Sequence, residues 1–196
     1  MEKKIKKVAV LGAGVMGATI AAHLANVGIP TIMLDIVPNK LTPDEEKKGL
    51  NLQHPAVRNR FAITGKQNLL RARPAALAVP ELASLIEVGN FEDHLSRLAA
   101  VDWIIEVVVE NLKIKQDLFK RVAVVRQPGT IVSSNTSGIP IKDMCAGMDL
   151  EFKQHFLGTH FFNPPRYMKL LEIIPLPETS PQVVSFMADF GERVLG

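Results

Sequence analysis

The 196-residue chain lacks several features that define other classes of protein. Cys145 is its single cysteine, which excludes an internal disulfide framework and a cysteine-rich metal site, so no bound metal is expected. Outside residues 8–30 it has no long uncharged apolar run, and a membrane span is not expected there. With 47% hydrophobic and 22% charged residues, its composition is that of an ordinary globular protein, for which we expect a cytoplasmic location.

Acidic residues are absent from one long segment. Residues 47–80 contain no Asp or Glu, although the net charge of the whole chain is only +3. The basic residues of this segment are Lys47, Lys48, Arg58, Arg60, Lys66, Arg71 and Arg73. Such a patch attracts a polyanion. Phe61 is its only aromatic residue, which argues against base stacking, so no nucleic-acid partner is predicted; a phosphorylated small ligand and a plain solvated face both stay open.

A glycine-rich turn near the N-terminus organises the rest of the chain. Residues 6–11 predict a buried parallel strand, residues 12–17 (GAGVMG) a tight turn, and residues 19–27 an alanine-rich helix. Residues 31–34 then form a second short apolar run, which ends on Asp35. This order of strand, turn, helix, strand and acid is typical of a dinucleotide-binding unit.

Each glycine falls where such a unit needs one. Gly12 permits the turn, Gly14 permits the backbone to approach a pyrophosphate, and Gly17 permits the helix to pack on the strand. Asp35 lies 18 residues past Gly17, near the spacing of the acid that binds a ribose 2′-hydroxyl, and it would repel a 2′-phosphate. NAD is therefore predicted over NADP, with turn contacts from Gly12, Gly14, Val15, Met16 and Gly17.

A targeting segment is the competing interpretation of this stretch. Two lysines precede an almost uncharged run over residues 8–30, as they do in a signal peptide. The three glycines, and the strand that leads to Asp35, favour the dinucleotide site instead.

The remaining chain alternates between strand and helix patterns. Strands are predicted at residues 84–88, 101–109, 130–134, 157–162 and 168–174, and helices at 92–99, 113–125 and 180–194. A proline-rich helical insertion occupies about residues 38–80, with helices at 43–48 and 58–72, and is expected over the mouth of the cofactor site. The fold class is α/β: a doubly wound, Rossmann-type, mostly parallel sheet with a helical insertion after the second strand.

Polar residues that follow the strands are the candidates for chemistry, because ligands bind beyond the carboxyl ends of such strands. Glu110 and Lys115 could flank a nicotinamide ribose, or form an exposed pair worth less than ~1 kcal/mol. Ser137 and Asn163 could bind a substrate oxygen, or satisfy turn backbone.

His160 differs from the other histidines, because it lies inside an apolar strand and a second apolar strand carries Glu172. Antiparallel pairing of these strands would bring the two side chains together. A carboxylate on one imidazole nitrogen raises the basicity of the other, as a general base acting on an alcohol requires. A core histidine with a satisfied ring is the alternative.

Together these residues resemble the L-3-hydroxyacyl-CoA dehydrogenase family. The similar stretches are residues 10–17 (VLGAGVMG), 106–115 (EVVVENLKIK), 134–137 (SNTS) and 158–174 (GTHFFNPPRYMKLLEII). The resemblance implies NAD-dependent oxidation of L-3-hydroxyacyl-CoA in fatty-acid β-oxidation. It implies His160 as catalytic base with Glu172 as its partner, Ser137 and Asn163 on the acyl-CoA oxygen, and Asp35, Glu110 and Lys115 on NAD.

The resemblance also indicates what surrounds residues 1–196. Their long insertion is similar to that of the bacterial and archaeal forms that carry an enoyl-CoA hydratase region. The family's helical second domain, which pairs subunits and closes over the substrate, is absent here, so residues 1–196 are expected to be the NAD-binding domain of a larger, homodimeric protein. Two other functions stay open: a dehydrogenase of a small hydroxy acid, and a non-catalytic NADH-binding protein such as the crystallin relative.

Overall fold

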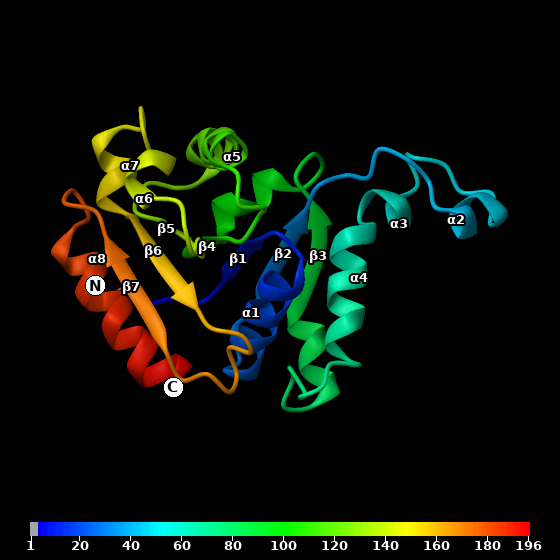
Figure 1. Cartoon of the computed structure of the whole chain (residues 1–196), viewed down its shortest axis with the longest axis horizontal. Helices are drawn as coiled ribbons and strands as arrows, with labels where there is room; N and C mark the ends of the chain where they lie inside the picture. The colour runs from blue at the N-terminus through cyan, green and yellow to red at the C-terminus, as the bar shows by residue number, and fades with distance from the viewer. Residues whose placement is uncertain (1–3) are drawn as a thin grey trace.

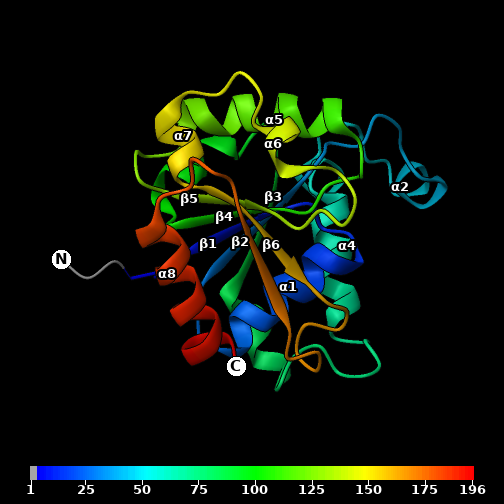
Figure 2. The same ribbon diagram turned by 60° about the vertical axis from the view of Figure 1, so that its left-hand side comes forward.

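The computed structural model describes residues 4–196 and shows one seven-stranded sheet covered by helices on both faces (Figures 1 and 2). The strands lie in the order β3-β2-β1-β4-β5-β6-β7, all parallel except β7, which runs antiparallel to β6. Their bounds are β1 Val8–Leu11, β2 Thr31–Asp35, β3 Ile86–Asn90, β4 Trp103–Glu106, β5 Ile131–Ser134, β6 Phe156–Phe161 and β7 Leu171–Pro175. The predicted doubly wound, mostly parallel sheet is confirmed.

The α-helices are α1 Val15–Asn26, α2 Pro43–Lys47, α3 Pro55–Arg58, α4 Arg60–Leu69, α5 Leu112–Val125, α6 Ile141–Met144, α7 Leu150–Gln154 and α8 Pro181–Phe190. Two 3₁₀ helices (Pro80–Leu85 and Leu95–Ala100) and a terminal π turn (Gly191–Leu195) complete the elements. None of the helices within residues 4–196 is long and apolar enough to cross a membrane.

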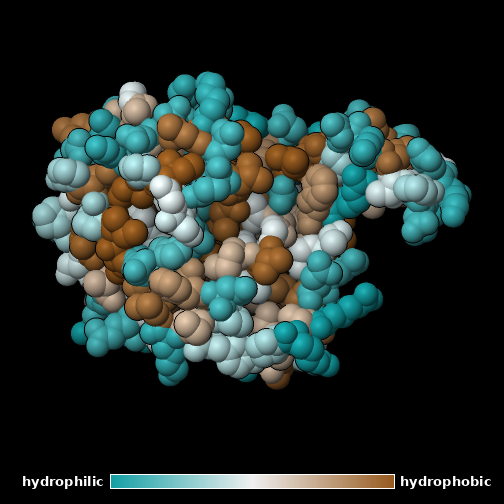
Figure 3. All heavy atoms as spheres, in the orientation of Figure 1, coloured by the Kyte–Doolittle hydropathy of each residue, from teal (hydrophilic) through white to brown (hydrophobic). Residues whose placement is uncertain are grey.

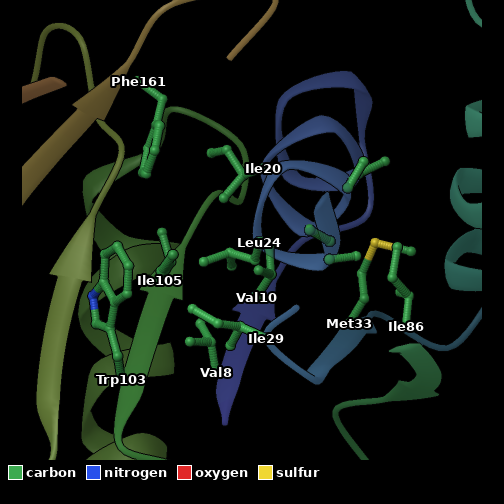
Figure 4. Packing of buried hydrophobic residues seen from close by; sticks show 14 of the residues in the cluster. Val8, Val10, Ile20, Leu24, Ile29, Met33, Ile86, Trp103, Ile105 and Phe161 are labelled. Carbon is green, nitrogen blue, oxygen red and sulfur yellow. The ribbon is translucent and has the colours of Figure 1, made fainter. Parts of the chain in front are cut away.

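Successive side chains of β1 point to opposite faces of the sheet and enter two separate hydrophobic cores. Val8 and Val10 pack into the core under α1, α4 and α8, whereas Ala9 and Leu11 pack into the core under α5, and all four side chains are fully buried. Figure 4 shows the first core, in which Val10 and Leu24 lie between the strands and α1. A strand buried on both faces must be apolar throughout, which explains the unbroken VAVL sequence.

The insertion divides into an arm and a packed helix. In the arm, α2 begins with a capping box between Thr42 and Glu45, and α2 and α3 extend away from the sheet (Figure 1). The helix predicted at residues 58–72 is present as α4 but was predicted too long, because the chain breaks at Asn59 and α4 ends at Leu69. The third helix, α4, packs beside α1 and reaches the glycine turn, where a Cβ on its Gly65 would lie 2.5 Å from the Ala13 carbonyl oxygen.

Three other predicted elements differ from the structure in their bounds or in their type. The strand predicted at residues 101–109 stops at Glu106, since that side chain accepts a hydrogen bond from the Val108 amide and turns the chain out of the sheet. The helix predicted at 92–99 is the 3₁₀ helix Leu95–Ala100. The strand predicted from residue 168 starts at Leu171, because residues 164–168 form a turn in which the amides of Tyr167 and Met168 bond the Pro164 carbonyl.

Candidate functional site

Each of the three glycines in the turn meets a different structural requirement. Gly12 has φ +114°, and a Cβ there would lie 2.4 Å from the Val107 carbonyl oxygen. A Cβ on Gly17 would lie 1.9 Å from the Gly12 carbonyl oxygen, whereas one on Gly14 would meet nothing within 4 Å. Gly14 therefore leaves open space in front of the amides that begin α1, where Val15 is the first helical residue.

Asp35 connects the second strand to this turn. Its Oδ2 accepts a hydrogen bond from the Ala13 amide at 2.6 Å, and its Oδ1 accepts one from the Ile36 amide at 2.7 Å. A carboxylate has about four acceptor positions, so both oxygens can accept further bonds. Asp35 borders a cavity of about 480 Å³ beyond the carboxyl ends of β1, β2 and β4, lined also by Gly12, Gly14, Val107, Ile114 and Arg121. The open Gly14 amide and this acid fit an adenosine nucleotide.

The glycines allow a test of this division of roles. Gly14→Ala should fold with an unchanged melting temperature but weaken NADH binding by at least about tenfold, because the added methyl fills the space that a pyrophosphate needs. Gly17→Ala should lower the melting temperature, because its methyl overlaps a backbone oxygen. Thermal melting and NADH fluorescence titration of both variants measure this, and equal melting losses in the two would contradict it.

The predicted contact between His160 and Glu172 is present. The two residues are register partners on antiparallel β6 and β7, and His160 Nδ1 lies 2.8 Å from Glu172 Oε2. His160 Nε2 lies 3.1 Å from Ser137 Oγ, on the turn after β5. Both ring nitrogens thus have partners, and the side chain is still 19% exposed. A histidine with only core contacts does not describe this arrangement.

The interpretation of Glu110 and Lys115 as an exposed ion pair is wrong, because the Lys115 side chain is only 1% exposed. Its ammonium lies 2.7 Å from Glu106 Oε1, 3.2 Å from Glu110 Oε2 and 3.4 Å from the Val108 carbonyl oxygen. Sequence reasoning missed Glu106, which is fully buried at the end of β4. The available signal was a lone carboxylate in an apolar strand, since a buried charge needs a partner.

Glu110 bonds the turn that carries Ser137. It accepts hydrogen bonds from the Thr136 hydroxyl and, at 3.1 Å, from the Gly138 amide. Burial opposes ionisation of this carboxyl, but the bonds from Thr136 and Gly138 and the Lys115 charge outweigh it and lower the pKa of Glu110 to about 2. The carboxylate is therefore charged at neutral pH.

Asn163 lies on a second cavity, of about 740 Å³, which shares Gly14, Asp35 and Ile36 with the first. Its lining comes from α1, α4 and the turns after them, and includes Val15, Phe61, Asn68, Arg73 and Pro164. Figure 3 shows apolar surface gathered in the middle of the face that carries α1, with hydrophilic residues around it. Asn163 lies two residues past the end of β6, the strand that carries His160.

Several basic side chains of residues 47–80 already have partners within the protein. Arg58 pairs with Asp93, Arg60 pairs with Glu45, and Lys66 donates to the Ile86 carbonyl at 2.7 Å. Arg73, in contrast, borders the larger cavity. The acid-free segment is therefore partly neutralised by acids outside it.

The glycine turn, the acid at the end of β2 and the crevice between them define a Rossmann-type dinucleotide-binding domain. The family model described as "3-hydroxyacyl-CoA dehydrogenase, NAD binding domain" matches residues 7–196, and the chain belongs to that family. The predicted family and the NAD cofactor are thereby confirmed.

Similar proteins carry matching names. A protein of Bacillus subtilis, "Probable 3-hydroxyacyl-CoA dehydrogenase", is 56% identical over 196 residues, which are 100% of this chain and 25% of that protein. A Deinococcus radiodurans protein of the same name is 50% identical over 98% of this chain and 52% of its own length. The crystal structure of Ralstonia eutropha (S)-3-hydroxybutyryl-CoA dehydrogenase superposes with TM-score 0.73 at 25% identity, over 97% of this chain and 61% of that one. The chain thus spans about a quarter of the length of the Bacillus subtilis protein and about half of the length of the Deinococcus radiodurans protein.

Proposed function

We propose that the protein containing this chain oxidises L-3-hydroxyacyl-CoA to 3-oxoacyl-CoA with NAD, as a step of fatty-acid β-oxidation. The observation that carries the proposal is the His160 ring, which is bonded by Glu172 on one nitrogen and faces Ser137 with the other. The relatives named 3-hydroxyacyl-CoA dehydrogenase support the reaction class.

The chain's own residues supply the acid–base chemistry. His160 Nε2 removes the proton of the substrate hydroxyl, while Glu172 holds the other ring nitrogen as N–H and stabilises the imidazolium that forms. Ser137 and Asn163 hold the reacting oxygen. Asp35 and the Gly14 amide would hold the adenosine half of NAD, and Glu110 would hold the nicotinamide ribose. The bound cofactor would supply the acceptor for the hydride of the carbinol carbon.

The larger cavity is the proposed acyl-CoA site. It lies between α1 and α4 and is bordered by Asn163, so the proposal places the thioester near the end of the strand that carries His160. Arg73 is the proposed contact for a CoA phosphate, because it is the basic residue of the acid-free segment on this cavity. The cytoplasmic location, and a homodimer formed through a helical second domain, remain predictions.

The substrate class is tested by comparing acetoacetyl-CoA with free acetoacetate in NADH consumption by the full-length protein. Acetoacetyl-CoA should be reduced and acetoacetate should not, because only the thioester offers phosphates to the basic segment. Comparable rates would favour a dehydrogenase of small hydroxy acids, and no turnover of either would favour a non-catalytic NADH-binding protein.

Asp35→Ala should weaken NADH binding by about 5- to 150-fold, because a ribose hydroxyl loses its charged acceptor at a cost of ~1–3 kcal/mol. The same change should narrow the preference for NADH over NADPH. Fluorescence titration with both cofactors measures this, with Asp44→Ala on the arm as a matched control. Equal affinity of the unchanged protein for NADH and NADPH would contradict the assigned role of Asp35.

A further inference from the structure

Glu106 is a buried carboxylate with no role in the proposed reaction, yet all its contacts lead toward the reacting residues. Both of its oxygens are occupied: Oε1 by Lys115 Nζ at 2.7 Å and by the Val108 amide at 2.7 Å, and Oε2 by the Ser134 hydroxyl at 2.5 Å. Ser134 is also the register partner of Glu106, on the neighbouring strand β5. Glu106 therefore joins β4, α5 and β5 at their site-facing ends.

Two connections run from Glu106 to the turn at residues 135–138. One runs through Ser134, whose hydroxyl also accepts the Thr136 amide at 3.3 Å. The other runs through Lys115 to Glu110, which accepts the Gly138 amide and the Thr136 hydroxyl. Ser137 lies between these anchored residues, so both connections fix the position of its hydroxyl.

Lys115 cannot reach a ligand without losing this arrangement. Its ammonium has three donors, and Glu106, Glu110 and the Val108 carbonyl occupy three directions around it. A 1% exposed side chain presents almost no surface to a cofactor. Lys115 thus acts through Glu110 and not by direct contact.

We propose that Glu106 is a positioning residue of the dehydrogenase: through Lys115 and Ser134 it fixes the turn that holds Ser137 against His160. This inference rests on the proposed function of His160. Replacing a buried ion pair by apolar residues often costs no stability, so the role assigned to this pair is to hold two strands and a turn in register. Ser137 Oγ lies 3.1 Å from His160 Nε2, and a shift of the turn by an ångström would break that contact.

The test is the Glu106→Gln variant of the full-length protein, assayed with acetoacetyl-CoA and NADH. Turnover (kcat) should fall about 10- to 100-fold, whereas KM for NADH should stay within about threefold, because the adenosine contacts at Asp35 and Gly14 lie elsewhere. Glu151→Gln is the matched control, since Glu151 likewise pairs with a buried cation, Arg126, and accepts the Gly129 amide, far from the Ser137 turn. It should lower the melting temperature and leave kcat unchanged.

Two further variants separate positioning from general stability. Ser134→Ala removes one hydroxyl donor and keeps the ion pair, so it should fold, and should lower kcat about three- to tenfold even if Glu106→Gln does not fold. The double variant Glu106→Gln with Lys115→Met leaves no buried charge unpaired; it should regain melting temperature but not kcat.

Recovery of kcat with melting temperature in the double variant would show that Glu106 serves stability alone and would overturn the inference. So would wild-type kcat in Ser134→Ala and Glu106→Gln, or a raised KM for NADH at unchanged kcat. These outcomes leave the proposed function intact as long as His160→Gln is inactive. Wild-type turnover by His160→Gln would instead remove the proposed function itself.

Discussion

Replacing His160 with Gln in the full-length protein should lower turnover of acetoacetyl-CoA by about 100- to 10,000-fold, the usual contribution of a general base. The Gln amide keeps much of the ring's size and polarity, so the β6–β7 pairing should survive. NADH affinity should stay nearly unchanged, because Asp35 and Gly14 lie at the other end of the crevice. Stopped-flow turnover and NADH titration measure the two quantities separately.

Glu172→Gln provides the companion experiment. It removes the charge that stabilises the imidazolium while keeping a hydrogen-bond acceptor 2.8 Å from Nδ1, so turnover should fall, though less than in His160→Gln. Glu178→Gln, on the turn that follows β7, is a control for the loss of one surface carboxylate. Wild-type turnover by both His160→Gln and Glu172→Gln would reduce the pair to a structural contact.

Residues 1–196 on their own should bind NADH, yet reduce acetoacetyl-CoA at least about 1,000-fold more slowly than the full-length protein. The proposed cofactor contacts from Gly12 to Glu110 all lie within the chain, but the chain spans only a quarter to about half of the length of these two relatives. Glu172 is half-exposed here, so solvent reaches the proposed base. Positioning and exclusion of water supply ~7–11 kcal/mol of barrier reduction, and we expect the rest of the full-length protein to provide part of it.

A side-by-side assay of residues 1–196 and the full-length protein at saturating NADH tests this expectation. The comparison is valid only where both bind NADH with similar affinity, which the fluorescence titration establishes first. Comparable turnover would show that the substrate cleft is already complete in residues 1–196.

The local parts of the site could be predicted from the sequence because they depend on neighbouring residues. The β1–turn–α1–β2 unit follows from glycine positions and apolar runs, and Asp35 lies at the end of β2 as predicted. His160 and Glu172 stood out as polar residues inside apolar runs. The helix predicted at residues 43–48 is equally local: it forms α2, which begins with the capping box between Thr42 and Glu45.

The predicted elements that were too long share a different cause. The helix at residues 58–72 and the strand at 101–109 were too long, because contacts with distant segments end them: Arg58 and Asn59 bond Asp93 and Asn90, and Glu106 bonds Lys115 and Ser134. Periodicity records the propensity of a segment and not the partners that stop it.

The sequence by itself determined the fold class, the family and NAD, because glycine spacing, strand patterns and the position of Asp35 are written in short stretches. Only the tertiary structure decided that His160 faces both Glu172 and Ser137, and that Lys115 is buried between Glu106 and Glu110. Strand register and burial depend on how the whole chain packs: a slip of one residue between β6 and β7 would turn Glu172 to the other face of the sheet.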